Sequence, residues 1–402
     1  MEVGPMNERS AGSDAVHSGN RVMEGITKPK VPPIYASSVY SFETLGDLDS
    51  IFDGEKNGYI YARMGHPNAD ILEQTVSALE GTESALVFSS GMSAITTALL
   101  AVLKPGDHII ADRILYGGTF SFIDGFLRDW GVSVDLVDTL DTDSVRMALK
   151  VNTKVIYLET ISNPMMGVAD IPVLAEIAAA NGTMLFVDNT FATPVLCRPA
   201  RMGADVVLHS LTKYLNGHSD VTGGVLAASR SFVDKSLKFR SMLGGSMSPF
   251  DAWLVQRGIR TLHLRMAAHS ANGIFLARAL EKHPAVIRVE YPGLERHASY
   301  GTARKILNDG FGGMLSFEIR GGEKAASEFI ERLEIVELVP SLASPSTTIS
   351  HPAKTSHRSL TEEQRQSVGI SGGLIRLSAG IEPVEPVWSD ISNALGSLDQ
   401  SN

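Results

Sequence analysis

Short apolar runs alternate with helix-like segments through the middle of the chain, and this alternation restricts the fold strongly. Each run is four to six residues long, as in a buried strand, and intervening segments such as 93–103, 142–149 and 171–180 have a helical pattern. Alternation of this kind favours a mainly parallel sheet with helices on both faces, in an α/β fold. The predicted strands cover residues 85–88, 108–111, 132–137, 154–158, 184–187, 205–208 and 225–228.

One predicted strand, 205–208, leads directly into the segment HSLTKYLNGH at 209–218. Ligands of α/β sheets bind at the carboxyl ends of strands. A lysine held there, Lys213, can lose its proton through desolvation and become a nucleophilic amine able to form a Schiff base. The neighbouring hydroxyls of Ser210 and Thr212 suit a phosphate group. Taken alone, Lys213 is more typical of a solvated lysine on a loop.

A carboxylate ends the strand predicted one βα unit earlier, at 184–187. Asp188, at that position, can pair with a protonated pyridine nitrogen, although a helix cap or turn explains it equally well when it is considered alone. Asp188 and Lys213 together supply the two groups that a pyridoxal 5'-phosphate (PLP) enzyme needs. The pair therefore predicts PLP as the cofactor.

Four motifs make the sequence resemble the Cys/Met-metabolism family of PLP-dependent enzymes: YIYAR at 59–63, SSGM at 89–92, YGGT at 116–119 and the lysine segment at 209–218. This family includes cystathionine γ-synthase, cystathionine γ-lyase, methionine γ-lyase and O-acylhomoserine sulfhydrylase. The resemblance extends over nearly the whole chain. It implies PLP fold type I, the aspartate aminotransferase-like fold, with a large, mainly parallel seven-stranded sheet domain and a small α+β C-terminal domain.

We expect three parts in the chain: an N-terminal arm contacting the neighbouring subunit (1–60), a PLP-binding large domain (61–246) and a small domain (247–402). Prolines and aromatics at 31–42 indicate an extended arm. The resemblance implies that Tyr61 and Arg63 lie against the phosphate in the neighbouring subunit's site. It also implies a homo-oligomer with shared active sites, most simply a dimer of dimers. Without the resemblance, Arg63 would be interpreted as a surface arginine.

The SSGM motif lies between a predicted strand and a helix, where backbone N–H groups and the helix dipole favour an anion. The motif is a weak signal alone, but the resemblance assigns Ser90, Gly91 and Met92 to cofactor binding. It also stacks Tyr116 on the pyridine ring with an acid/base role and places Asn163 near the cofactor's phenolic oxygen. Without the other motifs, Tyr116 would be an ordinary half-buried aromatic residue.

Arg376 lies in a predicted strand, 374–379, where a buried and unpaired charge would be costly. The resemblance supplies a bidentate partner for it, the α-carboxylate of an amino-acid substrate. The alternative is an edge-strand arginine that faces water. The other residues expected to contact the substrate are Ser341, Tyr61 and Asn163.

Composition limits the range of partners. The formal net charge of −10 argues against nucleic-acid or anionic-membrane binding, and no apolar run has membrane-spanning length. Cys197, the single cysteine, excludes an internal disulfide and fits a reducing cytoplasm, and residues 1–14 show no signal-peptide pattern. His351 and His357 lie in one loop, but without a third ligand we expect no metal site.

Several positions depart from the family's patterns. Gly118 stands where bacterial methionine γ-lyases carry a cysteine, and Pro340 precedes Ser341 where cystathionine γ-lyases commonly have a glutamate. SLASPS at 341–346 replaces the usual Ser-Leu-Gly-Gly-x-Glu pattern, and Lys354 has an unusual place in its loop. These departures cluster where the distal end of the substrate is expected, which indicates an atypical substrate.

The sequence therefore predicts γ-elimination or γ-replacement on sulfur amino acids or activated homoserine derivatives. Gly118 favours a cystathionine γ-lyase or γ-synthase, with methionine γ-lyase or O-acylhomoserine sulfhydrylase as the alternative. A catalytically silent PLP-binding regulator is an alternative of another class, against which the intact set of Lys213, Asp188, Tyr116 and Arg376 argues. Elimination and replacement share every early step, so both remain open at this stage.

Overall fold

The computed structural model of the chain describes residues 10–18, 29–358 and 360–398. Its central element is a seven-stranded sheet in the order β1-β7-β6-β5-β4-β2-β3. Only β7 runs against the others, since it pairs antiparallel with both β1 and β6 while the remaining pairs are parallel. The strands are β1 (Ser84–Phe88), β2 (His108–Asp112), β3 (Ser133–Val137), β4 (Thr153–Glu159), β5 (Met184–Asp188), β6 (Val206–Ser210) and β7 (Gly224–Ala228). The predicted α/β class and the seven strands are confirmed, each strand to within two residues at either end.

Side chains alternate between two hydrophobic clusters that lie on opposite faces of this sheet. On β5, for example, Leu185 and Val187 belong to one cluster and Phe186 belongs to the other. Such alternation follows from the two-residue period of a strand, and near-complete burial follows from helices on both faces. The helices around the sheet are α3 (Pro67–Glu80), α4 (Gly91–Val102), α5 (Gly117–Phe120), α6 (Thr142–Ala148), α7 (Ile171–Ala180), α8 (Thr193–Leu196) and α9 (Arg230–Leu243), with the short helices η1 (Ser121–Leu127) and η2 (Pro199–Met202).

Local signals explain where the helices next to the site begin and end. At α3, the His66 ring accepts a hydrogen bond from Ala69 N–H (3.1 Å), Pro67 occupies the first turn, and Gly81 ends the helix at φ 79°. At α4, the Ser90 hydroxyl accepts a bond from Ser93 N–H (3.1 Å). The N-terminus of α4 is thereby fixed at the carboxyl end of β1.

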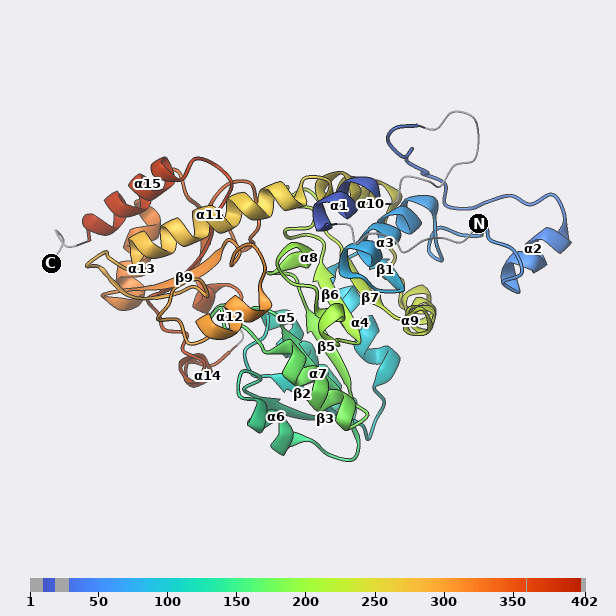
Figure 1. The fold of residues 1–402 in the computed structure, drawn as a ribbon, viewed down its shortest axis with the longest axis horizontal. Helices are drawn as coiled ribbons and strands as arrows, with labels where there is room; N and C mark the ends of the chain where they lie inside the picture. The colour runs from blue at the N-terminus through green and yellow to red at the C-terminus, as the bar shows by residue number, and fades with distance from the viewer. Residues whose placement is uncertain (1–9, 19–28, 359, 399–402) are drawn as a thin grey trace.

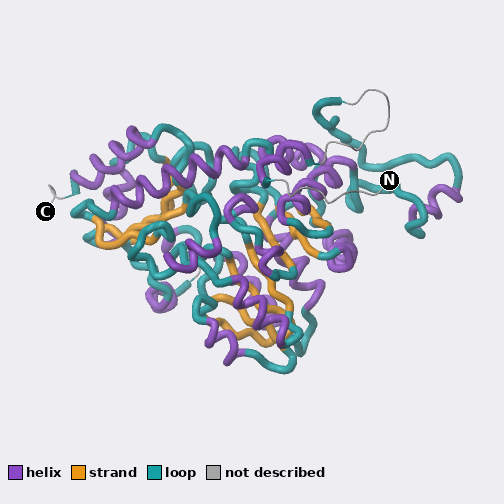
Figure 2. Tube along the Cα trace, viewed as in Figure 1, coloured by secondary structure: helices purple, strands orange, loops and turns teal. Residues whose placement is uncertain are grey.

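A second, five-stranded sheet lies beside the first, in the order β10-β11-β12-β9-β8 (Figures 1 and 2). Its strands are β8 (Val286–Glu290), β9 (Met314–Ile319), β10 (Glu337–Leu338), β11 (Thr348–Ser350) and β12 (Leu374–Ser378). Its helices are α12 (Tyr300–Ile306), α13 (Gly322–Glu331), η3 (Pro352–Lys354), α14 (Glu362–Ser367) and α15 (Val384–Gly396). A third hydrophobic cluster fills this part of the molecule, so the C-terminal sheet has its own core.

Residues 249–282 have a long helical pattern in the sequence, and the structure divides it into two helices, α10 (Pro249–Ile259) and α11 (Leu262–Leu280). The helices part at Arg260 and Thr261, where the Arg265 side chain turns back to the carbonyl oxygens of Gly258 and Tyr214. Helix α11 then runs from the large sheet to the small one, as Figure 1 shows. It therefore ties the two parts together.

Residues 29–65 overlap the predicted arm (1–60) and extend five residues beyond it; this segment, called the arm from here on, includes helix α2 (Leu45–Phe52) and extends away from both sheets (Figure 1). Several of its apolar side chains are exposed, among them Val39, Leu45 and Phe52. Helix α1 (Ala11–His17) precedes the arm and packs against α3 and α11 instead. Among the described residues, no helix is both long and apolar enough to cross a membrane.

Candidate active site

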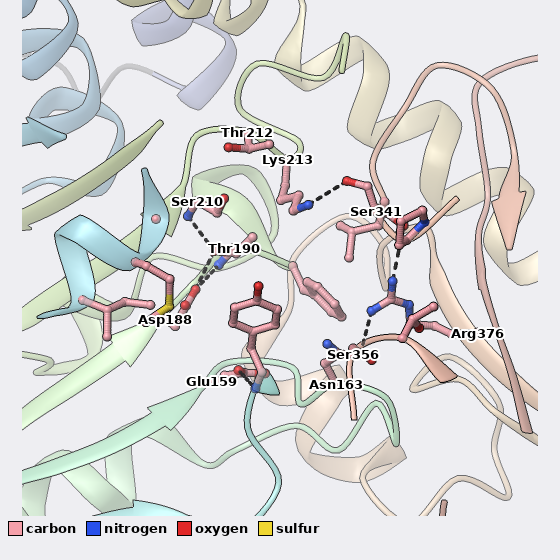
Figure 3. A pocket seen from close by; sticks show the side chains of 18 of the residues that line it. Glu159, Asn163, Asp188, Thr190, Ser210, Thr212, Lys213, Ser341, Ser356 and Arg376 are labelled. Atoms are coloured by element: carbon pink, nitrogen blue, oxygen red, sulfur yellow. Dashed lines mark hydrogen bonds between the residues drawn. The ribbon is translucent and has the colours of Figure 1, made fainter. Parts of the chain in front are cut away.

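A cavity of about 630 Å³ opens where strands β4, β5 and β6 end and the C-terminal sheet approaches them (Figure 3). The predicted site residues that line it come from both sheets: Ser90, Gly91, Met92, Tyr116, Asn163, Asp188, Ser210, Thr212, Lys213, Ser341 and Arg376. Asp188 and Ser210 lie at one end of the cavity, Arg376 lies at the other, and Lys213 with Ser341 lies between them. The fold thus brings together residues that are up to 286 positions apart (Ser90 and Arg376).

Lys213 follows β6 and reaches into the cavity. Its Nζ donates a hydrogen bond to Ser341 Oγ (2.7 Å), and no other side chain of the described residues bonds to this amine. Burial, together with the nearby positive charge of Arg376, lowers the pKa of Lys213 from 10.5 to about 8. A considerable fraction of the amine is therefore neutral near pH 8, which is the state that attacks a carbonyl carbon.

Asp188 ends β5 and is held by its neighbours. Thr190 donates to Asp188 Oδ1 from its hydroxyl (2.5 Å) and from its backbone N–H (3.0 Å), and Ser210 N–H donates to Thr190 Oγ1 (2.8 Å). Burial raises the pKa of Asp188, while the two bonds from Thr190 oppose that rise. A positively charged ring N–H bound beside Asp188 would stabilise the carboxylate that burial disfavours.

Glu159 is a second acid at this end of the cavity. It ends β4 in register with Asp188 on β5, and its Oε1 accepts a hydrogen bond from Tyr116 N–H (2.7 Å). Burial, and secondarily the charge of Asp188, raises the pKa of Glu159 well above its ordinary value. Glu159 therefore fixes the backbone of Tyr116, a residue that lines the cavity and is 46% exposed.

The small residues at the α4 end allow a close approach of three chain segments. A Cβ on Gly91 would lie 3.1 Å from Ser210 Cβ, and a Cβ on Gly224 would overlap the carbonyl of Ser90. Backbone N–H groups at the start of α4 and the Ser210 hydroxyl can therefore surround one small anion. The Thr212 hydroxyl accepts a bond from Gly223 N–H (3.0 Å), which ties the lysine loop to the start of β7.

Arg376 is 4% exposed at the other end of the cavity. Its Nη1 donates to Asn163 Oδ1 (3.0 Å) and its Nη2 donates to the Ser341 carbonyl (3.3 Å), whereas no carboxylate of the described residues forms an ion pair with it. Burial lowers the pKa of Arg376 to about 10. A buried guanidinium with only neutral partners is a ready site for a ligand carboxylate.

Two predicted residues lie outside this cavity. Tyr61 is 44% exposed in the arm, and the Arg63 guanidinium lies 5.6 Å from the centre of its ring. Arg63 also donates to the carbonyl of Ser241 in α9. Both were predicted to act in a neighbouring subunit's site, and that prediction stands as made.

Several residues of the cavity were not assigned a role from the sequence. Glu159 and Thr190 follow from their places at strand ends, a signal that was used for Asp188 and Lys213 but not for these two residues. Lys354 and Arg358 also line the cavity, although they belong to a loop far along the chain. Their approach depends on tertiary packing, since the Ser356 carbonyl would overlap a Cβ at Gly117. Only the unusual placement of Lys354 gave a hint.

The loop that departs from Ser-Leu-Gly-Gly keeps the backbone shape of a glycine. Ala343 has φ 67°, in the left-handed region, and its N–H donates to Ser378 Oγ (2.8 Å).

His357 is buried, with a pKa lowered to about 4 by desolvation and then by the charge of Arg376. Within the described part of the chain, no group of three or more His, Cys, Asp or Glu side chains is placed to hold a metal ion.

Comparisons with known proteins agree with this geometry. The family model described as "Cys/Met metabolism PLP-dependent enzyme" matches residues 12–396. The chain is 40% identical to an L-methionine gamma-lyase of Fusobacterium nucleatum subsp. polymorphum over 96% of this chain and 98% of the relative. It is 43% identical to a cystathionine beta-lyase of Lactococcus lactis subsp. cremoris over 90% and 93%. A cystathionine gamma synthase from Xanthomonas oryzae pv. oryzae, solved in complex with aminoacrylate and cysteine, superposes with a TM-score of 0.92 at 36% identity, covering 98% of this chain and 100% of that one.

Proposed function

The chain belongs to the Cys/Met metabolism family of PLP-dependent enzymes, and from this premise we propose that the cavity is its active site, that it catalyses γ-elimination or γ-replacement, and that it prefers substrates of the cystathionine γ-lyase or γ-synthase type. The observation that carries the proposal is the convergence of Lys213, Asp188 and Arg376 on one cavity. Relatives with different named activities match this chain at similar identity, so sequence identity alone does not select the substrate. The substrate preference has to be inferred from the residues of the cavity.

The residues present fit PLP. Ser90, Gly91, Met92, Ser210 and Thr212 would hold the phosphate, because backbone N–H groups and hydroxyls meet there around a space that a Cβ on Gly91 would narrow. Asp188 would pair with the ring nitrogen, Tyr116 would stack on the ring, and Asn163 would lie near its phenolic oxygen. When bound, PLP supplies an electron-accepting ring that stabilises negative charge at the substrate's Cα.

The remaining roles belong to side chains of the cavity. Arg376 binds the substrate's α-carboxylate and orients Cα, with Asn163 and Ser341 holding the guanidinium in place. The amine of Lys213 accepts the proton from Cα and then moves a proton at Cβ, a step that departure of the γ-substituent requires. Its bond to Ser341 and its lowered pKa keep it close to the substrate and partly neutral. Tyr116 takes the proton from the incoming amine and assists the leaving group.

We further propose that two chains share each site. The arm carries exposed apolar side chains and presents Tyr61 and Arg63 away from its own cavity, which supports a role at a neighbouring subunit. An arginine fork and a phenol are good phosphate donors. Two such two-fold dimers would associate into a homotetramer. A location in the cytoplasm remains a prediction from the sequence.

The test is an assay of the purified holoenzyme with methionine, cystathionine, homocysteine and O-acylhomoserines, each with and without a thiol acceptor. We expect turnover of γ-substituted amino acids that is lost in Lys213→Ala. No turnover of any of them, from a folded protein with bound PLP, would support the catalytically silent alternative instead.

A further inference from the structure

Two cations of the cavity remain unused after the proposed roles are assigned. Among the charged residues that line it, Glu159 and Asp188 lie at the ring end, Lys213 is the catalytic amine and Arg376 takes the α-carboxylate. The other two are Lys354 and Arg358. Lys354 is the last residue of η3 and Arg358 lies on the turn that follows, in a chain whose formal net charge is −10, so a local positive charge here needs an explanation.

The turn is anchored, so these cations are held at the cavity. Thr355 N–H donates to the His351 carbonyl (3.0 Å), His357 N–H donates to the Pro352 carbonyl (2.9 Å), and His351 Nε2 lies 2.7 Å from the Gly372 carbonyl oxygen. Strand β11, which precedes the turn, pairs with β12 and places Ser350 opposite Arg376. Lys354 and Arg358 therefore follow directly from the strand beside the α-carboxylate site.

Their charges are only partly compensated. Lys354 Nζ lies 2.6 Å from Glu323 Oε1 on α13, and both side chains are more than half exposed. Arg358 forms no ion pair with a carboxylate of the described residues, and its side chain is exposed at the cavity. Glu323 thus offsets the charge of Lys354, while no ion pair within the described residues offsets the positive charge of Arg358 beside the substrate space.

We propose that Lys354 and Arg358 form a subsite for a second carboxylate, at the distal end of the γ-substituent. The inference rests on the proposed function and narrows it to amino acids whose γ-group carries a carboxylate, such as a succinyl ester or the amino-acid half of a thioether. Arg358 makes the main contact, and Lys354 contributes the part of its charge that Glu323 does not neutralise. Neutral γ-groups, such as an acetyl ester or a thiomethyl group, gain nothing from this subsite.

The kinetic test compares O-succinyl-L-homoserine with O-acetyl-L-homoserine, because the two esters differ in the distal carboxylate but share the reacting bond. We expect the wild-type ratio of kcat/KM to favour the succinyl ester, and Arg358→Gln to lower that ratio by about fivefold or more, as for loss of a charge-assisted contact that is partly exposed. Lys354→Gln should lower the ratio less. The matched control is Arg146→Gln, on α6, which pairs with Asp143 outside the cavity and should leave the ratio unchanged.

A variant expected to raise the ratio of kcat/KM keeps the test independent of folding defects, because a folding defect would not favour one ester. Glu323→Gln removes the neutralising partner of Lys354, so the ratio should rise above that of the wild type. Added salt should lower the wild-type ratio, because the contact is electrostatic. An unchanged ratio in both Arg358→Gln and Glu323→Gln, or equal losses for the two esters in Arg358→Gln, would overturn the subsite.

A binding measurement separates failure of the subsite from failure of the proposed function. L-2-aminosuberate and L-norleucine have no leaving group, and only the first carries a distal carboxylate. Calorimetry on the holoenzyme should show tighter binding of L-2-aminosuberate, with the difference reduced in Arg358→Gln. If neither the esters nor the other γ-substituted amino acids react but this difference is found, the proposed function is wrong and the subsite stands. If both esters react and no difference is found, the subsite is wrong and the proposed function stands.

Discussion

At the scale of single residues, the site consists of ionisable groups that burial has made unfavourable in their charged form. Lys213 and Arg376 donate hydrogen bonds to neutral groups, Asp188 accepts them from a neutral group, and no full counter-charge of the described chain contacts any of the three. Their pKa values are shifted in the direction that desolvation dictates. A carboxylate bound at Arg376 and a ring N–H bound at Asp188 would supply the missing counter-charges at the two ends of the cavity. The same unpaired groups would therefore serve both in binding and in the reaction.

Replacing Arg376 with Ala should weaken every amino-acid substrate. Loss of a buried bidentate pair costs about 2–5 kcal/mol, so kcat/KM should fall by more than about tenfold. Bound PLP should remain, because Arg376 lies at the opposite end of the cavity from Asp188 and Ser210. Steady-state kinetics with the visible absorbance as a control measure both effects. An unchanged kcat/KM would remove Arg376 from the substrate site.

The pKa of Lys213 predicts how its reactivity depends on pH. The protonated amine is unreactive, so labelling of the PLP-free protein by limiting acetic anhydride should rise with pH and level off above a midpoint near 8. Arg376→Ala should move the midpoint upward, because a positive charge that disfavours protonated Lys213 is removed. Peptide mass analysis measures the labelled fraction at each pH. A midpoint at the ordinary value of 10.5 would contradict the structure of the site.

At the scale of elements, the large sheet could be predicted because most of its strands are short apolar runs buried on both faces. The runs that became β4 and β5, for example, contain almost only apolar residues before their terminal acids. Strands β8, β10 and β11 were missed for physical reasons. VIRVE at β8 mixes charged and apolar residues at one side of its sheet, and β10 and β11 have only two and three residues. Their pairing is set by tertiary contacts rather than by local pattern.

The candidate site, like the fold, could be predicted only in part from the sequence. Residues at the ends of β1, β5 and β6 were found because strand ends and motifs coincide there. Lys354 and Arg358 reach the cavity through a turn whose path depends on Gly117 and Gly372, and no local pattern marks such an approach. The break between α10 and α11 was missed for a similar reason, since it is stabilised by the distant contacts of Arg265.

The contact between β7 and α4 gives a prediction at this scale. A Cβ in Gly224→Ala would overlap the Ser90 carbonyl, so the N-terminus of α4 has to move away from β7. We expect a loss of about 1–3 kcal/mol in the free energy of unfolding, as for other overpacked sites, and faster release of PLP. Gly396→Ala is the matched control, because no atom lies within 4 Å of its Cβ position. Denaturant unfolding and dialysis of bound PLP measure the two effects, and equal behaviour of the variants would contradict this packing.

At the scale of the whole molecule, the cavity needs both sheets, and the arm extends away from both (Figure 1). The large sheet supplies Lys213 and Asp188, while the C-terminal part supplies Ser341 and Arg376. The arm contributes nothing to the cavity of its own chain, because Tyr61 and Arg63 lie outside it. This position of the arm is consistent with the proposal that a neighbouring chain delivers its arm to the cavity.

Subunit complementation tests that proposal. Arg63→Ala and Lys213→Ala should each be nearly inactive alone. In a mixed two-fold dimer, one active site carries both substitutions and the other carries neither. Co-refolding should therefore restore up to about half of the wild-type activity per mixed dimer. Arg146→Ala co-refolded with Lys213→Ala serves as the control for subunit mixing. Mixed dimers that regain no activity would show that the sites are not shared.

The central claim is that Lys213 is the residue to which PLP is attached. Borohydride reduction of the holoenzyme, followed by proteolysis and peptide mass analysis, tests it most directly. The structure predicts that the visible absorbance is lost and that a phosphopyridoxyl group is found on the peptide containing Lys213, and on no other lysine. Recovery of the group on another lysine, or an unmodified Lys213 peptide after complete loss of the absorbance, would contradict the account.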